Sequence, residues 1–303
     1  MIKVGFYVDT EWALGCIHAS LMKRLYAYGI DCHLIEWAKS YNWNEAAAIA
    51  ESFDYIVTLP GTPLNTLVSS YNVPAEKIIA IAHGGFDIHT ATTHDNPLDR
   101  VHKYACISSA LVDYSKSLGI SRVPTVVRNG IDFHSFYREP AKELGALGYA
   151  GALKQVSQLN LNDDWKRGHL AVTISQRTHT YLHTIEKSHF LAMPKYYGDI
   201  DCLLVTSTEQ EACGLPLMEA AAAGRLPISA QIGILNEFDH NPGVIVPTDA
   251  DEFVQGATEA IQYLIENPTH FHKYCVEAQE YAREFYDWSS TIENWANLFL
   301  MDA

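Results

Sequence analysis

The sequence predicts an α/β protein with two doubly wound halves, each a parallel sheet with helices on both faces. Short apolar runs typical of buried parallel strands alternate with helical stretches along the 303 residues. The pattern restarts after residue 133, and two halves of roughly 100–150 residues fit the usual size of a domain. Because ligands of such sheets bind at the carboxyl ends of the strands, we expect the site in a cleft between the halves.

The first half begins with an apolar strand over residues 2–9. A bend then leads into a helix over about residues 17–28, and Gly29 follows that helix as a glycine often does. The other strands expected in this half are residues 31–38, 53–61, 77–85, 104–110 and 125–132. Helical stretches lie between them, which predicts that the strands pair in parallel.

The second half repeats this pattern. An expected strand over residues 147–153 is followed by a polar loop over residues 154–166. The other strands expected here are residues 171–176, 202–207, 226–230 and 243–247. From about residue 250 the chain is predicted to be mostly helical, with a weak break at Asn267-Pro268.

The composition indicates filled globular cores, with 48% hydrophobic and 11% aromatic residues. The chain opens on a strand without a basic leader, and no apolar run approaches the ~20 residues that span a bilayer. Its six cysteines form no Cys-x-x-Cys pair, and Cys106 and Cys202 lie in strand-like apolar runs. We therefore expect a reduced, cytoplasmic protein.

The formal net charge of -15 is concentrated in the second half of the chain. Residues 1–138 hold 11 Lys and Arg against 13 Asp and Glu, whereas residues 139–303 hold 10 against 23. An acidic surface repels polyanions, so the balance argues against broad nucleic-acid binding. No helix carries a face rich in Lys and Arg that would hold the protein on anionic lipid.

The stretch most informative about function is residues 208–224, TEQEACGLPLMEAAAAG. An apolar strand-like run precedes it, Gly214 allows a ligand to approach the main chain, and Pro216 suits the first turn of a helix. The free N–H groups at such a helix start can hold an anion. Glu211 and Glu219 lie on either side of that start. The pattern is also compatible with an ordinary strand–helix unit that carries surface glutamates.

These residues resemble a known family, because EACGLPLMEA is similar to the E-x7-E signature of retaining GT-B glycosyltransferases, the glycosyltransferase family 4 group. Ala212 and Cys213 stand where the family usually has a glycine and an aromatic residue. Three further blocks match in family order: VVRNGID, the approach strand YYGDIDCLLVTS, and RLPISA after the motif. The resemblance implies two Rossmann-like domains that face each other across a cleft.

The resemblance also implies roles for the residues of the motif. In the family, the glutamate at the position of Glu211 binds hydroxyls of the donor sugar, and the one at Glu219 binds the nucleotide ribose. Carboxylates suit this task because each accepts several hydrogen bonds. The backbone of Cys213, Gly214 and Leu215 is expected to face the sugar and the diphosphate.

The diphosphate also needs cations. Ala152 stands where the family has an arginine, so we consider Lys154, which lies two residues further on but lacks the bidentate fork of arginine. A second cation is expected at Lys166 or Arg167, in the block that resembles the family's Lys-Gly motif. The sequence does not separate these two residues, and a solvated basic pair at a helix start is the alternative.

In the first half, the resemblance implies that His83 is the active-site histidine near the donor sugar, and that a turn around Gly15 approaches the diphosphate or the acceptor. His89, His94, Asp87 and Asp95 are too loosely spaced for a metal site, so we expect a mobile acceptor-side loop over residues 86–99. Asp199-Ile-Asp201 resembles a metal-binding Asp-x-Asp, but Asp201 matches the aspartate before the motif's strand. No metal is expected.

The sequence thus predicts a metal-independent, retaining hexosyltransferase that uses a nucleotide-diphosphate sugar and needs no cofactor. The predicted domains are residues 1–133 on the acceptor side, 134–285 for the donor, and a helix over 286–303 that returns to the first domain. The sequence does not identify the acceptor; a glycan or a small molecule is expected. Three alternatives stay open: a nucleotide-sugar-binding protein with little activity, a transferase acting on a modified nucleic-acid base, and a nucleotide-sugar epimerase.

Overall fold

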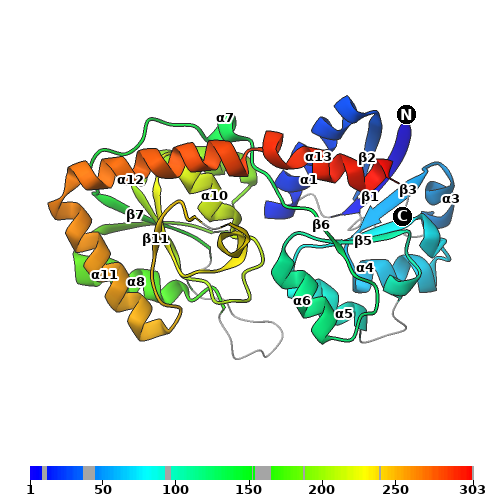
Figure 1. Cartoon of the computed structure of the whole chain (residues 1–303), viewed down its shortest axis with the longest axis horizontal. Coiled ribbons are helices and arrows are strands. Elements are labelled where there is room, and N and C mark those ends of the chain that lie inside the picture. Colours follow the sequence, from blue (N-terminus) through cyan, green and yellow to red (C-terminus); the bar gives the residue numbers. More distant parts are fainter. Residues whose placement is uncertain are drawn as a thin grey trace. The chain divides into compact units, whose positions relative to one another are not determined.

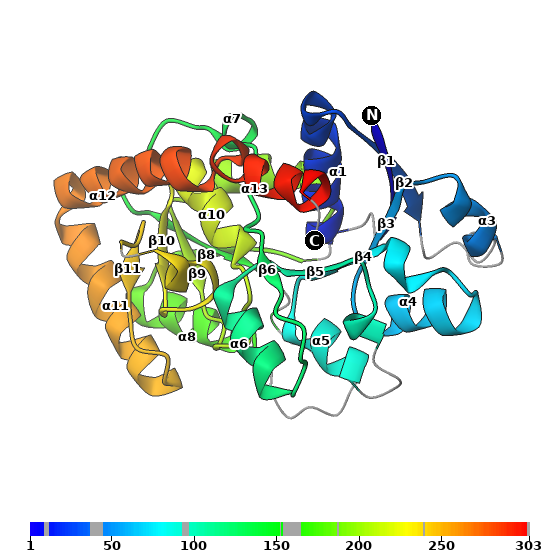
Figure 2. The ribbon, with the colours of Figure 1, turned by 45° about the vertical axis from the view of Figure 1, so that its right-hand side comes forward.

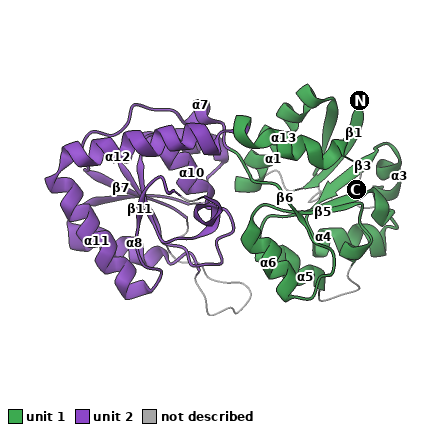
Figure 3. Cartoon of the chain, in the orientation of Figure 1, with its two compact units in different colours: residues 1–130, 289–303 green, residues 131–288 purple. Residues whose placement is uncertain are grey.

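The computed structural model describes residues 1–8, 12–36, 45–92, 97–151, 153, 165–186, 188–238 and 240–301. The chain forms two compact units, which are treated separately below (Figure 3). Unit 1 combines Met1–Gly130 with Ser289–Ala303, and unit 2 is Ile131–Trp288. The sequence-based boundaries follow residues 133 and 285, whereas the units change after residues 130 and 288.

Unit 1 contains a six-stranded sheet in the order β2-β1-β3-β4-β5-β6, and every pair in it is parallel. The centre of the sheet is fully apolar, as expected for strands covered on both faces. The strands are β1 (Ile2–Val8), β2 (Ile30–Glu36), β3 (Tyr55–Thr58), β4 (Ile78–Ala82), β5 (Lys103–Cys106) and β6 (Thr125–Val126).

Helices cover both faces of this sheet, with α1 and α13 on one face and α4, α5 and α6 on the other (Figure 1). The α-helices are α1 (Trp12–Leu25), α3 (Ala46–Glu51), α4 (Thr62–Asn65), α5 (Gly85–Thr92), α6 (Ser109–Ser117) and α13 (Trp288–Leu300). Short 3-10 or π turns are η1 (Tyr26–Tyr28), η2 (Thr66–Ser70), η3 (Ala75–Lys77) and η4 (Pro97–Asp99). Gly29 ends the first helical segment in a left-handed conformation, as predicted.

Two predictions for unit 1 are wrong. Gly15 lies inside α1, so there is no turn around it. Part of the loop expected over residues 86–99 is helical, because α5 begins at Gly85. The Asp87 carboxylate accepts hydrogen bonds of 3.1 Å from the N–H groups of both His83 and Gly84, which would otherwise lack partners at the helix start.

The C-terminal helix α13 packs in unit 1, where both views place it beside α1 (Figures 1 and 2). The indole N–H of Trp295 donates to the carbonyl of Arg128 at 2.7 Å, and the Phe299 ring lies 6.2 Å from that of Phe6. Trp295 and Phe299 are both buried. The last helix therefore completes the core of the unit that the first residues begin.

Unit 2 contains a five-stranded parallel sheet in the order β11-β10-β9-β7-β8. Helices α10 and α12 cover one face and α8 and α11 the other (Figures 1 and 2). The strands are β7 (Ala146–Ala150), β8 (Tyr181–Ile185), β9 (Cys202–Val205), β10 (Leu226–Ser229) and β11 (Val244–Ile245). The helices are α7 (Phe133–Phe136), α8 (Gly168–Thr178), η5 (Phe190–Ala192), α9 (Met193–Gly198), α10 (Leu215–Ala222), η6 (Gly233–Glu237), α11 (Ala250–Glu266), α12 (Pro268–Tyr281) and η7 (Ala282–Tyr286).

The strand expected over residues 171–176 is wrong, because these residues belong to α8. Their β-branched side chains suggested a strand, but Leu170, Ala171 and Ile174 form a buried stripe with helical spacing. The strand of this region is β8, which starts at Tyr181 and pairs with β7. Within the described part of the chain, no helix is long and apolar enough to cross a membrane.

Candidate functional site

The motif around Gly214 forms the predicted strand–loop–helix unit at the carboxyl end of β9. The loop over residues 206–214 leads into α10, with Pro216 at its first positions. Gly214 has φ 78°, in the left-handed region where glycine is favoured. Almost the whole of α10 is buried, and its run of alanines lets it pack closely against the sheet. The start of the helix is thereby fixed against the core.

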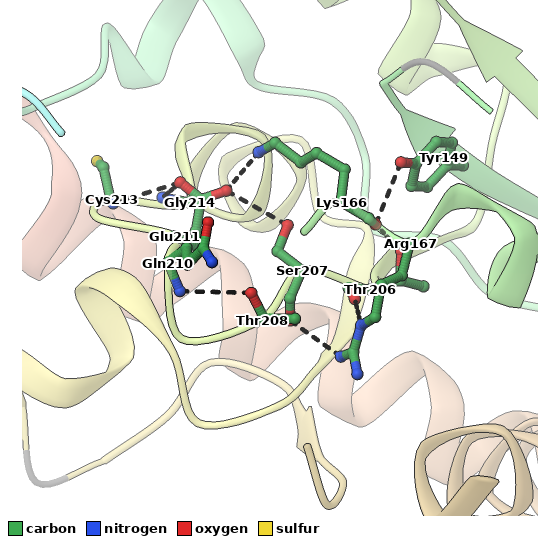
Figure 4. A network of polar contacts seen from close by, with 10 residues as sticks. All are labelled: Tyr149, Lys166, Arg167, Thr206, Ser207, Thr208, Gln210, Glu211, Cys213 and Gly214. Carbon is green, nitrogen blue, oxygen red and sulfur yellow. Dashed lines mark hydrogen bonds and ion pairs between the residues drawn. The ribbon is translucent and has the colours of Figure 1, made fainter. Parts of the chain in front are cut away.

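The Glu211 carboxylate lies at the centre of this loop (Figure 4). Its Oε1 accepts from the N–H groups of Gly214 at 3.0 Å and Cys213 at 3.4 Å. Its Oε2 accepts from the Ser207 hydroxyl at 3.3 Å and forms an ion pair with Lys166. Burial raises the pKa of Glu211, but the charge and hydrogen bond of Lys166 and the two N–H donors outweigh it, so the pKa is lowered. Glu211 therefore stays ionised.

Lys166 and Arg167, which the sequence could not separate, point in different directions (Figure 4). The Lys166 ammonium faces Glu211 and lies 4.1 Å from the centroid of the Trp165 ring. The Arg167 guanidinium donates to the carbonyls of Thr206 at 2.6 Å, Ser207 at 3.1 Å and Thr248 at 2.6 Å. Lys166 thus contributes to the charged cluster, whereas Arg167 ties the loop to the segment before α11.

Other contacts hold the loop in place. The Lys166 carbonyl accepts from the Thr206 hydroxyl at 2.6 Å and from the Tyr149 hydroxyl at 3.3 Å. On the other side, the Ile234 N–H donates to the Cys213 carbonyl at 2.9 Å. Gly233 has φ 54°, and a Cβ there would lie 2.8 Å from the Cys213 carbonyl oxygen. Only glycine permits this close approach to the loop.

Glu219 has a different environment from Glu211. Its side chain is 3% exposed, and its Oε2 accepts from the Tyr197 hydroxyl at 2.8 Å. Burial raises its pKa from 4.5 to about 8, although the Tyr197 hydrogen bond acts in the opposite direction. Tyr197 has no predicted role, although it is one of the two tyrosines that begin the approach-strand block. The sequence contains this tyrosine in a recognisable block, but it does not show that Glu219 accepts its hydrogen bond.

His83 lies in unit 1, immediately after β4. Both of its ring nitrogens are buried and find no hydrogen-bond partner among the described residues. Its ring meets that of His18 edge-on, with 5.3 Å between centroids. Burial, together with His18, lowers the pKa of His83 well below its ordinary value, so the imidazole is neutral. A neutral imidazole with unsatisfied nitrogens can donate one hydrogen bond to a ligand and accept another.

The remaining predicted residues are placed as follows. Leu215 begins α10 next to Gly214, and Gly15 lies in α1 of unit 1. Lys154 lies outside the described residues, as does Ala152. Asp201 Oδ2 accepts from the N–H groups of Gly145 and Ala146, both at 2.9 Å, which gives it a structural role. Across the described ranges, no group of three or more His, Cys, Asp or Glu side chains could hold a metal ion.

Comparisons with known proteins agree with the predicted fold. Residues 168–267 match the family described as glycosyl transferases group 1. No curated protein matches the chain in sequence. Three solved structures superpose over nearly the whole chain, and at these low identities the likeness shows the fold. They are HepE from Anabaena in complex with UDP-glucose (TM-score 0.73, 15% identity, 100% of both chains), the catalytic domain of starch synthase IV from Arabidopsis thaliana bound to ADP and acarbose (0.71, 12%, 98% of both), and sucrose-phosphate synthase from Thermosynechococcus elongatus (0.68, 13%, 99% of this chain and 98% of that one).

Proposed function

We propose that this chain, which has the GT-B fold and carries a glycosyl transferases group 1 region, is a retaining, metal-independent hexosyltransferase that uses a nucleotide-diphosphate sugar. The observation that carries the proposal is the cluster of Glu211, Lys166 and two backbone N–H groups at the start of α10. It combines a carboxylate, which accepts hydrogen bonds from hydroxyls, with the Lys166 ammonium, which can pair with a diphosphate. The solved structures with the same fold include HepE bound to UDP-glucose.

In the proposed complex, the donor sugar binds through its hydroxyls to Glu211. An ionised carboxylate only accepts hydrogen bonds, which suits a ligand that presents several hydroxyl donors. The diphosphate takes its charge compensation from Lys166 and from the positive end of α10. Arg167 positions the loop through its three carbonyl contacts and does not bind the donor.

The proposed chemistry needs no protein nucleophile. The bond between the sugar C1 and the diphosphate oxygen breaks, and the acceptor hydroxyl oxygen forms its bond to C1 on the same face. The proton of that hydroxyl passes to an oxygen of the leaving diphosphate. Lys166 and the helix start stabilise the negative charge that develops there, the kind of electrostatic effect that dominates many such reactions. The role of His83, a neutral imidazole in unit 1, stays a prediction.

The compartment is part of the proposal. None of the six cysteines, all of which the structure describes, forms a disulfide, and Cys106, Cys202 and Cys275 are buried. Reduced thiols without disulfides are the usual state in a reducing compartment. This supports the proposal of a cytoplasmic enzyme.

The first test is a thermal-shift panel of UDP, GDP and ADP and their hexose conjugates, each with and without EDTA. A ligand that binds only the folded state raises the melting temperature by mass action. We expect one nucleotide family to stabilise the protein, with the same shift in EDTA. The donor found in this way is then incubated with acceptors, and NMR of the product reports the configuration at C1.

Glu211→Gln is the matched variant, because it keeps the shape of the side chain and removes its charge. We expect it to fold and to lose donor turnover by at least about a hundredfold, the scale of losing a charged hydrogen-bonding group at a reacting centre. An EDTA-sensitive shift or an inverted product would contradict the metal-free, retaining mechanism. Donor binding without turnover in the wild type would favour a nucleotide-sugar-binding protein, the alternative suggested by Ala152.

A further inference from the structure

The structure pairs Glu219 with a hydroxyl that the proposed reaction does not yet use. Glu219 lies in the second turn of α10, five residues after Gly214. Side chains of a helix tilt toward its N-terminus, so the Glu219 carboxyl is directed back toward the start of α10. Tyr197, at the end of α9, donates to Glu219 Oε2 at 2.8 Å.

We propose that Tyr197 is a positioning residue for the nucleotide ribose: its hydroxyl fixes Oε2 of Glu219, so that Oε1 is held ready for the 2′- and 3′-hydroxyls. This inference rests on the proposed function and on the role that the family resemblance implies for Glu219, which is to bind the ribose of the donor. Tyr197 does not touch the nucleotide and acts through the carboxyl alone.

Tyr197 is itself held rigidly. Its side chain is fully buried, and its ring packs edge-on against Phe136 and Tyr196, with centroids 5.9 and 5.2 Å away. Its carbonyl accepts from the buried Arg225 side chain at 2.8 Å. The position of the hydroxyl oxygen is therefore fixed. Its hydrogen bond in turn fixes the position of Oε2 of Glu219.

The carboxyl needs such a partner because its last torsion is soft. The terminal torsion of glutamate is broad and roughly two-fold, so packing alone does not fix the carboxyl plane. With Tyr197 bound to one oxygen, the plane is set. None of the described residues donates to the other oxygen, Oε1. Oε1 can therefore accept hydrogen bonds from the hydroxyls of a ligand.

The test compares nucleotides with and without ribose hydroxyls. Calorimetric titrations use UDP, GDP and ADP together with their 2′,3′-dideoxy forms, and the pair with the tightest wild-type affinity is carried into the variants. Tyr197→Phe keeps the ring and removes the hydroxyl. We expect it to weaken the ribonucleotide about five- to tenfold and the dideoxynucleotide less than about twofold, the scale of one hydrogen bond to an ionisable group.

Tyr196→Phe is the matched control. It removes a hydroxyl from the neighbouring residue of the same helix, where that hydroxyl donates to the His183 carbonyl at 3.3 Å. We expect it to leave the ratio of the two affinities unchanged, even if it lowers stability. Glu219→Gln is expected to reduce the ratio as Tyr197→Phe does, and the double variant to lose little more.

The outcomes separate the two proposals. If no nucleoside diphosphate binds the wild type, the proposed function is wrong. If the wild type binds nucleotides but Tyr197→Phe weakens both forms by the same factor, the hydroxyl has a structural role only and the inference is overturned, while the proposed function stands. A wild type that does not distinguish ribose from dideoxyribose overturns the inference in the same way.

Discussion

Glu211 and Glu219 are the same residue type in one motif, yet their surroundings shift their pKa values in opposite directions. Glu211 meets a cation and two N–H groups, whereas the buried carboxyl of Glu219 accepts from the Tyr197 hydroxyl and from no other described residue. The first therefore remains a carboxylate at neutral pH. The carboxyl of Glu219 is protonated at pH values below its pKa of about 8.

This difference predicts how stability depends on pH. Because the folded-state pKa of Glu219 is raised from 4.5 to about 8, the folded protein binds more protons than the unfolded chain over that range. The contribution of Glu219 to the free energy of unfolding therefore falls as pH rises from about 5 to 8. Glu219→Gln removes this titration, so we expect its stability relative to wild type to improve across the range, by up to a few kcal/mol in total. Chemical denaturation at pH 5 and pH 8 measures it.

Glu211→Gln provides the comparison for that experiment. The lowered pKa of Glu211 means that its stabilising contribution is complete above the unfolded value of 4.5 and is lost as pH falls through the folded value. Its difference from wild type should accordingly change in acid and stay constant between pH 5 and 8. If both variants show the same pH profile, the assigned environments are wrong.

Lys166 and Arg167 make separate predictions because they face different partners. Lys166→Met is expected to weaken binding of the nucleoside diphosphate about tenfold or more, since it removes the cation of the cluster. Arg167→Lys loses the fork that reaches three carbonyls, so we expect it to lower the free energy of unfolding by ~1–3 kcal/mol. Its nucleotide affinity, measured well below its melting temperature, should stay within about threefold of wild type. The reverse pattern would make Arg167 the diphosphate ligand.

For individual residues, the sequence was informative about the residue type but not about the direction in which each side chain points. The E-x7-E spacing and the glycine before the helix identified the loop, since a short motif on consecutive residues is local. Lys166 and Arg167 are adjacent, and the conformation of the backbone decides which way each side chain points. Arg167 adopts the left-handed conformation, with φ 47°. The partner of Tyr197 depends on how α9 packs against α10, which no local pattern contains.

Among the elements, the loop before α10 depends on the segment that supports it. Gly233 has φ 54°, and a Cβ there would lie 2.8 Å from the oxygen and 2.9 Å from the carbon of the Cys213 carbonyl. Gly233→Ala must therefore displace the loop. We expect a loss of ~2–4 kcal/mol in the free energy of unfolding and weaker nucleotide binding.

Gly29→Ala is the control for the conformational part of that loss. Gly29 has φ 78°, and a Cβ there meets nothing within 4 Å. We expect it to cost ~1–2 kcal/mol and to leave nucleotide affinity unchanged. If the two variants have equal effects on stability and binding, the contact with Cys213 does not position the loop.

The elements that sequence reasoning placed wrongly share a cause. Residues 171–176 contain β-branched side chains, and residues 86–99 are rich in polar ones, so composition outweighed spacing in both cases. In α8 the buried stripe at residues 170, 171 and 174 determines the helix, and in α5 the Asp87 carboxylate binds the N–H groups that precede it. Both effects are local, since Asp87 contacts residues three and four positions before it and the stripe in α8 lies within residues 170–174, so helical spacing carried the signal in each case.

For the molecule as a whole, the alternation of strands and helices was sufficient to predict two doubly wound halves. Each unit repeats one rule, in which buried parallel strands are covered by helices on both faces (Figure 1). Each unit is built from one continuous stretch of the chain, except that α13 joins unit 1 from the C-terminal end. That helix follows unit 2 along the chain and packs in unit 1.

This arrangement makes the stability of unit 1 depend on residues at the far end of the sequence. Trp295 is fully buried, and its indole N–H donates to the Arg128 carbonyl at 2.7 Å. Trp295→Ala removes a large side chain and leaves that carbonyl without its donor, so we expect a loss of ~3–5 kcal/mol. Hydrogen exchange read by mass spectrometry should show faster exchange across residues 1–130, with residues 131–288 close to wild type.

Phe271→Ala is the matched change in unit 2, because Phe271 is fully buried in α12. It should accelerate exchange in residues 131–288 and leave residues 1–130 protected. If Trp295→Ala instead loosens both units equally, they unfold as one cooperative body, and α13 does not belong energetically to unit 1 alone. The same exchange data repeated with bound nucleoside diphosphate would show added protection in the loop before α10, which connects the stability of unit 2 to the proposed donor site.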